Sequence, residues 1–348
     1  MQTKKNYTVY DVAKLAGTSA TTVSRVLNNN GYPVSDKLRK KVIKMVEKLN
    51  YSPNAVAKSL KYTSSSEIGV IVPTISNPFY SSAILGIQQQ IDSHGFNILL
   101  YNTFRHVENE RHYLQILYNK RVNGVILSAV AEDGCNILEF SKKGMHFVLL
   151  DQKIEGLNCN NILFDSREGA RMATDYLINH GHSKVALITT PLTRWTRRQI
   201  SLGYCDALSE NSEIADKPII LEATAEKEEN QLIYENTVGI KLAKQFIESK
   251  CDATGVLCVN DMVAFGFIQE LNKNSIKVPR DVSVIGIDDI PFASMFSPAL
   301  TTIKCFAFEI GSLAGSILID KINGNYSLDA SLKIEPMLII RDTVRKLK

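Results

Sequence analysis

TVYDVAKLAGTSATTVSRVLN, residues 8–28, has the pattern of two short helices joined by a tight turn. Thr8 and Asp11 have the spacing of a helix start, in which a threonine oxygen and an acidic side chain satisfy free backbone N–H groups. Apolar residues then recur with helical spacing, and Gly17 supplies the left-handed conformation that ends the helix. Ser19 is placed to cap a second helix, so the stretch predicts a helix-turn-helix.

A third helix is expected after Ser35, with apolar residues on one side and mostly basic residues on the other. The first 61 residues contain twelve Lys or Arg and three Asp or Glu, whereas the remainder contains 28 and 33. A basic head on a mildly acidic body indicates a polyanionic partner for the head alone. For the lysines of the third helix, a solvated surface is as good an interpretation as phosphate contact.

The second helix is the expected DNA-reading element, because its N-terminal part enters the major groove in a helix-turn-helix. Ala20, Thr21 and Arg25 are therefore candidates for contacts with base edges, and the donor fork of arginine matches the two acceptors of guanine. Thr and Arg occur on any helix surface, but their place in a basic segment favours DNA contact.

The segment YSPNAVAKSLK, residues 51–61, predicts a helix that is too short to be stable alone. Together with residues 8–28, it resembles the lactose-repressor (LacI/GalR) family of bacterial regulators. The resemblance implies a hinge helix that orders on operator DNA and inserts Leu60, flanked by Ala57 and Lys61, into the minor groove. Such a wedge unstacks a base step, and the kinked duplex then makes wider contact with the protein.

The predicted DNA contacts combine the helix-turn-helix with the hinge segment. They are Thr8, Tyr10, Ser19, Ala20, Thr21, Thr22, Arg25, Asn28, Tyr51, Asn54, Ala57, Leu60 and Lys61. The expected partner is near-palindromic double-stranded operator DNA, bound by a homodimer that places one recognition helix on each half-site. No apolar heptads follow Asp342, so a tetramer-forming tail is not expected.

Beyond Glu67, apolar strands alternate with amphipathic helices, which predicts an α/β body with parallel sheets covered on both faces. The body resembles the same family up to about Asp342, which implies a type I periplasmic-binding-protein-like architecture of two lobes joined by three crossovers. The expected division is 1–50 for the helix-turn-helix head, 51–66 for the hinge and linker, and 67–348 for the effector-binding and dimerisation body. Its lobes are expected to be 67–164 plus about 293–323, and about 165–292 plus 324–348.

Polar residues follow several of the predicted strands, and open α/β sheets bind ligands beyond the carboxyl ends of their strands. Arg194, Asn260 and Asp288 match effector contacts of the family, and their groups suit the hydroxyls of a sugar. Aromatic side chains nearby in the sequence pattern suit the apolar face of a sugar ring. The predicted effector contacts are Phe79, Tyr80, Ser128, Asp165, Arg194, Trp195, Thr196, Tyr234, Asn260 and Asp288. Each of them has an alternative role as a helix cap, a loop bond or lobe packing.

One position departs from the family. The arginine often found three residues before the family's glycine, here Gly203, is replaced by Ile200. Arg194, Arg197 or Arg198 is available as a substitute, so the identity of the effector stays open.

Motifs of enzymes and metal sites do not occur in the sequence: there is no GxSxG elbow, P-loop, GxGxxG fingerprint or HExxH pair. The six histidines lack metal-ligand spacing, and His180-Gly-His182 suits helix capping. The six cysteines form no CxxC pair, which favours reduced thiols over zinc or disulfides. We therefore expect no catalysis, no metal and no cofactor.

Neither a secretion signal nor 18 consecutive apolar residues occur, so we expect a cytoplasmic protein without a membrane span. These features and the basic head disfavour a transport binding protein of the same body fold. The sequence as a whole predicts a transcription repressor whose operator affinity is controlled by a small-molecule effector, a sugar or a sugar phosphate. Two alternatives stay open: a non-exported binding protein without a regulatory role, and a regulator of a non-sugar ligand. Whether the effector releases the repressor or is needed for binding also stays open.

Overall fold

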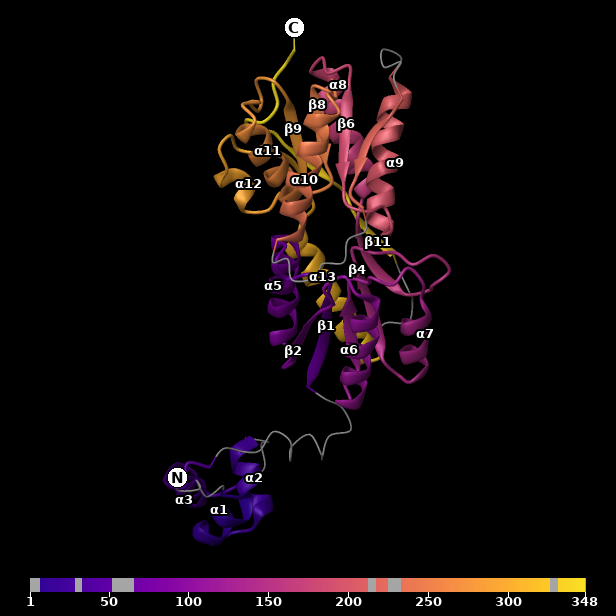
Figure 1. Cartoon of the computed structure of the whole chain (residues 1–348). Helices are drawn as coiled ribbons and strands as arrows, with labels where there is room; N and C mark the ends of the chain where they lie inside the picture. The colour runs from indigo at the N-terminus through magenta and orange to yellow at the C-terminus, as the bar shows by residue number, and fades with distance from the viewer. Residues whose placement is uncertain are drawn as a thin grey trace. The chain divides into compact units, whose positions relative to one another are not determined.

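A computed structural model of the chain describes residues 7–28, 33–51, 66–211, 217–224, 233–325 and 331–347. The chain divides into two compact units, Met1–Ser64 and Ser65–Lys348. The first unit contains helices and the second contains two sheets with their covering helices (Figure 1).

The first unit contains helices α1 (Val9–Ala16), α2 (Ala20–Asn28) and α3 (Asp36–Lys48). Helix α1 begins where the sequence predicts, because the Thr8 backbone N–H donates to Asp11 Oδ2 at 2.7 Å and the Thr8 hydroxyl accepts from the Asp11 backbone N–H. Gly17 ends it with a φ of 65°. The predicted helix-turn-helix is therefore confirmed.

The three helices pack on a small apolar core that contains one buried residue of α3 and several from α1 and α2. Its buried members are Val12, Ala13, Ala16, Val23, Val26 and Val42. Such a core leaves most of the basic residues on the surface, and Lys37, Lys40, Lys41, Lys44 and Lys48 of α3 are exposed.

The second unit is built on two six-stranded sheets, and the first has the strand order β11-β5-β4-β3-β1-β2. Its strands are β1 (Glu67–Val72), β2 (Asn97–Asn102), β3 (Gly124–Leu127), β4 (His146–Leu150), β5 (Asn160–Phe164) and β11 (Ser331–Ile334). All of its strand pairs are parallel. Strands β3, β4 and β5 are almost entirely buried, as expected for a parallel sheet covered by helices on both faces.

The second sheet has the order β12-β10-β9-β8-β6-β7. Its strands are β6 (Val185–Thr189), β7 (Ile219–Glu222), β8 (Gly255–Cys258), β9 (Ser283–Asp288), β10 (Thr301–Lys304) and β12 (Met337–Ile339). The pairs are parallel except for β10 with β12, which is antiparallel. The predicted α/β body with parallel sheets is confirmed.

Helices connect these strands. They are α5 (Pro78–Asp92), α6 (Val107–Asn119), α7 (Cys135–Lys142), α8 (Ser166–Asn179), α9 (Trp195–Glu210), α10 (Tyr234–Glu248), α11 (Asp261–Lys273), α12 (Phe292–Met295) and α13 (Ala307–Ile322). Helices α5 and α13 approach closely, since a Cβ atom on Gly86 would lie 2.0 Å from the Phe308 carbonyl oxygen. No helix in the described parts of the chain is long and apolar enough to span a bilayer.

The chain passes between the two sheets three times, after β5, after β10 and after β11. The approximate lobe limits expected from the sequence need correction at the last two crossings. Residues 301–304 form β10 of the second sheet rather than part of the first lobe, and residues 331–334 form β11 of the first sheet. We call the first sheet with its helices lobe 1 and the second with its helices lobe 2.

Candidate functional site

The carboxyl ends of strands from both lobes carry the polar residues of the candidate site. Ser128 follows β3 and Asp151 follows β4 in lobe 1, whereas Asn260 follows β8 and Asp288 ends β9 in lobe 2. Parallel strands place such residues at one edge of a sheet, which is where open α/β folds bind ligands.

Arg194 connects the two lobes directly. It lies in lobe 2 at the N-terminus of α9, and its Nη1 donates to the Tyr80 hydroxyl at 3.0 Å while its Nη2 donates to Ser128 Oγ at 3.1 Å. The Ser128 hydroxyl also lies 3.5 Å from the Tyr80 hydroxyl. The structure thus brings together three residues that the sequence singled out as effector contacts.

Two further contacts join the lobes around Arg194. Gln152 Nε2 of lobe 1 donates to Thr196 Oγ1 of lobe 2 at 3.2 Å, and both side chains are buried. Arg105 of lobe 1 forms an ion pair with the buried Glu235, and its guanidinium carbon lies 5.0 Å from the centre of the Tyr234 ring. Thr196 and Tyr234, both predicted effector contacts, therefore take part in contacts between the lobes.

Asp151 is a site residue that our sequence analysis missed. Burial raises the pKa of its carboxyl to about 6, although Arg194 and Arg197 lower it, and its Oδ1 atom has no hydrogen-bond partner. The sequence held the necessary signal, because Asp151 directly follows the apolar run that forms β4.

Asp288 and Asp261 place two carboxyl groups close together in lobe 2. Burial raises the pKa of Asp288 well above its usual range, the neighbouring Asp261 raises it further, and Arg197 lowers it. Asp261 accepts from the Thr302 hydroxyl at 2.5 Å and from the Ile290 backbone N–H at 2.9 Å. Burial raises the pKa of Asp261 to about 7. Neutral or partly neutral carboxyl groups at these positions can donate as well as accept hydrogen bonds.

The side chain of Asn260 has one hydrogen-bonded atom and one buried atom without a partner. Its Oδ1 accepts from the Val263 backbone N–H at 2.9 Å and so caps α11. Its Nδ2 is buried without a hydrogen-bond partner, and buried polar groups are rarely left so unless a ligand or water satisfies them.

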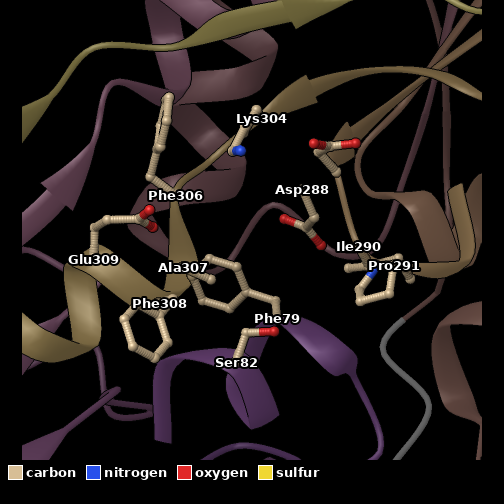
Figure 2. A pocket seen from close by; sticks show the side chains of 11 residues that line it. Phe79, Ser82, Asp288, Ile290, Pro291, Lys304, Phe306, Ala307, Phe308 and Glu309 are labelled. Atoms are coloured by element: carbon tan, nitrogen blue, oxygen red, sulfur yellow. The ribbon is translucent and has the colours of Figure 1, made fainter. Parts of the chain in front are cut away.

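A pocket of about 200 Å³ lies where α5 of lobe 1 meets β9, β10 and α13 (Figure 2). Phe79 contributes an aromatic wall and Asp288 a carboxyl group to the same pocket. Its lining residues are Phe79, Ser82, Asp288, Asp289, Ile290, Pro291, Lys304, Phe306, Ala307, Phe308 and Glu309. The pocket joins two further predicted effector contacts from different lobes.

Two predicted effector contacts stand apart from these groups. Asp165 caps α8 by accepting from the Glu168 backbone N–H at 3.1 Å, and it forms an ion pair with Lys333 of β11. The polar contacts of Asp165 are therefore with α8 and β11 and not with Arg194 or Tyr80. Trp195 is half-buried at the first position of α9, next to Arg194 in the chain.

On the head, the predicted DNA contacts divide into exposed and structural side chains. Tyr10 and Thr21 are exposed, whereas Ala20, Thr22 and Arg25 are half-buried. Ser19 Oγ accepts from the Thr22 backbone N–H at 3.1 Å, so this hydroxyl caps α2, as the Thr8 hydroxyl helps to cap α1.

Tyr51 packs against the head core. Asn54, Ala57, Leu60 and Lys61 lie outside the described residues, as does the side chain of Asn28. Within the described part of the chain, no group of three or more His, Cys, Asp or Glu residues is arranged to hold a metal ion.

Two family models match parts of the chain. Residues 8–54 match the model for bacterial regulatory proteins of the lacI family, and residues 174–344 match a periplasmic binding protein-like domain.

Two transcription repressors are similar to this chain over nearly its whole length. The HTH-type transcriptional repressor PurR of Vibrio atlanticus is 34% identical over 342 residues, which cover 98% of this chain and 99% of the repressor. The repressor PurR of Pasteurella multocida is 31% identical over 340 residues, covering 97% and 98% of the two chains. Both relatives are transcription repressors, not enzymes.

Solved structures are also similar to this chain over most of its length. The lac repressor dimer bound to operator and the anti-inducer ONPF has a TM-score of 0.84 and 27% identity, and covers 98% of this chain and 100% of that chain. A LacI family transcriptional regulator from Enterococcus faecium with bound ribose has a TM-score of 0.71 and 28% identity, and covers 81% and 100%.

Proposed function

Because the chain belongs to the lacI family of bacterial regulatory proteins and is a DNA-binding transcription repressor, we propose that a sugar or sugar phosphate bound between its lobes controls its affinity for operator DNA. The observation that carries this proposal is the contact of Arg194 with Tyr80 and Ser128, which joins the lobes at the carboxyl ends of their strands. A ligand that competes with or adds to this contact changes how the lobes are held together.

The polar groups of the site suit a polyhydroxy ligand. Asp151 Oδ1 and Asn260 Nδ2 are buried without partners, so the site offers an acceptor and a donor that a ligand can satisfy. Phe79 adds an aromatic wall to the pocket, which suits the apolar face of a sugar ring. The ribose bound to the Enterococcus faecium regulator, at 28% identity, supports this ligand class.

The DNA-binding half of the proposal rests on α2. We propose that Thr21 and Arg25 read base edges in the major groove and that exposed Tyr10 contacts the DNA backbone. We further propose a homodimer, which places two copies of α2 on the half-sites of a near-palindromic operator. Leu60, in the hinge segment, would then insert at the centre of the operator.

Control of DNA affinity requires that the effector bind the DNA-competent state and the other state with different affinities. Rearranged contacts of Arg194, Thr196 and Tyr234 would change the relative pose of the lobes, and so the spacing of the two heads in a dimer. Coupling of this kind is worth about 1–3 kcal/mol, which corresponds to a change of about 5- to 150-fold in affinity.

Binding of purified protein to labelled DNA from upstream of its own and neighbouring genes tests this function. Fluorescence anisotropy at fixed salt, with and without a panel of sugars and sugar phosphates, should reveal a specific complex whose Kd one compound changes by at least fivefold. The direction of that change gives the sign of the response. Specific binding that no sugar changes, with a response to another class of metabolite, would contradict the sugar proposal and leave the repressor intact.

A further inference from the structure

Helix α6 of lobe 1 carries a buried carboxyl group outside the contacts of the candidate site. Glu110 lies in the first turn of the helix and is fully buried. Its Oε2 atom accepts from the Val130 backbone N–H at 2.7 Å and from the Ala131 backbone N–H at 3.3 Å. Both N–H groups belong to the segment that follows β3, so Glu110 holds this segment against α6.

Ser128 begins the same segment and forms the lobe 1 side of the contact between the lobes. Its hydroxyl accepts from Arg194 Nη2 at 3.1 Å and lies 3.5 Å from the Tyr80 hydroxyl. Its backbone N–H donates to the Ile71 carbonyl oxygen at 3.0 Å, which fixes the start of the segment. Because Glu110 fixes the segment just beyond Ser128, the backbone at Ser128 is held from both sides.

The loop before α6 contacts lobe 2 at a second place. Arg105 forms an ion pair with Glu235 of α10, whose side chain is only 3% exposed. Phe104 and Arg105 have φ values of 52° and 61°, a conformation that residues with a side chain adopt rarely and at a cost in energy. The first turn of α6 therefore lies between two contacts that join the lobes, one made by Arg105 directly and one made through Ser128.

A buried carboxyl group costs stability unless hydrogen bonds compensate for its desolvation. Burial raises the pKa of Glu110, and the hydrogen bonds from Val130 and Ala131 lower it in part. These two residues lie beyond the end of β3, so their N–H groups need an acceptor from outside the sheet, and Glu110 supplies it. An apolar side chain would fill the same space but could not hold this segment.

We propose that Glu110 is a positioning residue for the effector response, because it holds the segment after β3 so that Ser128 presents its hydroxyl to Arg194. Glu110 thereby sets how firmly the lobes are held together. This inference rests on the proposed control of operator affinity by an effector between the lobes. Glu110 acts through Ser128 and is assigned no contact with the effector.

Variants of α6 in the full-length protein separate this role from packing. Glu110→Met removes the acceptor and keeps a long side chain, Glu110→Gln keeps an acceptor oxygen, and Glu108→Met changes an exposed residue of the same helical turn. Glu110→Met leaves two backbone N–H groups without their acceptor, so its Tm should fall. The Tm of Glu110→Gln and of Glu108→Met should stay near that of the wild type.

Quenching of Trp195 fluorescence by acrylamide tests the lobe contact without DNA or sugar, because Trp195 is the one tryptophan in the chain and directly follows Arg194. Ser128→Ala and Glu110→Met should each raise the quenching constant, and Glu110→Gln should keep the wild-type value. Since Glu110 acts through Ser128, adding Glu110→Met to Ser128→Ala should raise it no further. A wild-type quenching constant in Glu110→Met, or additive effects in the double variant, would overturn the proposal.

Operator binding provides the functional readout, with operator DNA selected from a random library by the wild-type protein. Without sugar, Ser128→Ala and Glu110→Met should change the operator Kd in the same direction by about 2- to 30-fold, and Glu108→Met should not change it. An operator Kd that Ser128→Ala changes and Glu110→Met does not would also overturn the proposal. If no sugar changes the operator Kd of the wild type, the proposed sugar effector is wrong, and the quenching of Trp195 still decides the role of Glu110.

Discussion

The Asp261 carboxylate accepts a 2.5 Å hydrogen bond from the Thr302 hydroxyl, and so connects the start of α11 to β10. Its second oxygen accepts from the Ile290 backbone N–H at 2.9 Å, in the loop that follows Asp288. Asp288 has a φ of 125°, a backbone conformation that L residues rarely adopt. Asp261 therefore helps to hold the backbone that presents Asp288 to the pocket.

This arrangement predicts a pH dependence of stability. The folded-state pKa of Asp261 is raised to about 7, so the carboxyl keeps its proton to a higher pH when folded than when unfolded. The contribution of Asp261 to stability is therefore greatest below about pH 4 and falls as the pH rises to about 7. In Asp261→Asn this contribution is absent. The Tm of the variant, measured relative to wild type at pH 5 and pH 8, should rise with pH, and a constant difference would contradict the role given to Asp261.

Asp288→Ala should abolish the response to effector and leave DNA binding unchanged. The Asp288 carboxyl group lines the pocket with Phe79, and among the described residues its side chain accepts only a weak hydrogen bond, from Cys305 Sγ at 3.8 Å. Removal of the Asp288 side chain should therefore weaken ligand binding more than it disturbs the packing of the lobes. Operator binding titrated with the active sugar provides the measurement, with Asp165→Ala as the control because Asp165 is engaged by α8 and Lys333. A normal response of Asp288→Ala would exclude this residue from the site.

Arg25→Ala should weaken specific operator binding by about 1–3 kcal/mol, because a bidentate contact with guanine is lost. Lys44→Ala, an exposed residue of α3, is the matched control. If α3 contacts phosphates, Lys44→Ala should weaken binding to all DNA equally and reduce the slope of log Kd against log salt by about 1. Equal losses on operator and random DNA for Arg25→Ala would show that it contacts the backbone only.

Leu60→Ala tests the hinge segment, which lies outside the described residues. A wedge in the minor groove bends the duplex, so the variant should lose specific affinity and DNA bending while it keeps nonspecific affinity. Gel mobility of circularly permuted operator fragments measures the bend. An unchanged bend angle with unchanged specific affinity would remove the hinge assignment.

Local signals made the head predictable. Thr8, Asp11 and Gly17 act within a few residues of one another, so the ends of α1 could be predicted from the sequence and are present in the structure. The alternation of buried strands and helices likewise predicts parallel sheets, because few other folds bury such continuous apolar strands.

Long-range contacts limited the rest of the prediction. Strand β11 joins lobe 1 by pairing with β5, some 170 residues earlier in the chain, so its sheet could not be read from residues 331–334 alone. Lys333 of the same strand forms an ion pair with Asp165, a contact that the sequence likewise did not reveal. The three arginines at the start of α9 are equivalent in the sequence. Only the structure shows that Arg194 contacts lobe 1, that Arg198 lies near Glu132 and that Arg197 Nε is buried without a partner.

Control of operator affinity by an effector bound between the lobes is tested most directly by measuring the coupling between effector and operator from both sides. Operator Kd is determined by anisotropy with and without saturating sugar, and sugar Kd by calorimetry with and without saturating operator. We predict that both ratios equal the same factor, about 5- to 150-fold, since coupling between two binding sites is reciprocal. Ratios of one, with both ligands bound, would contradict it.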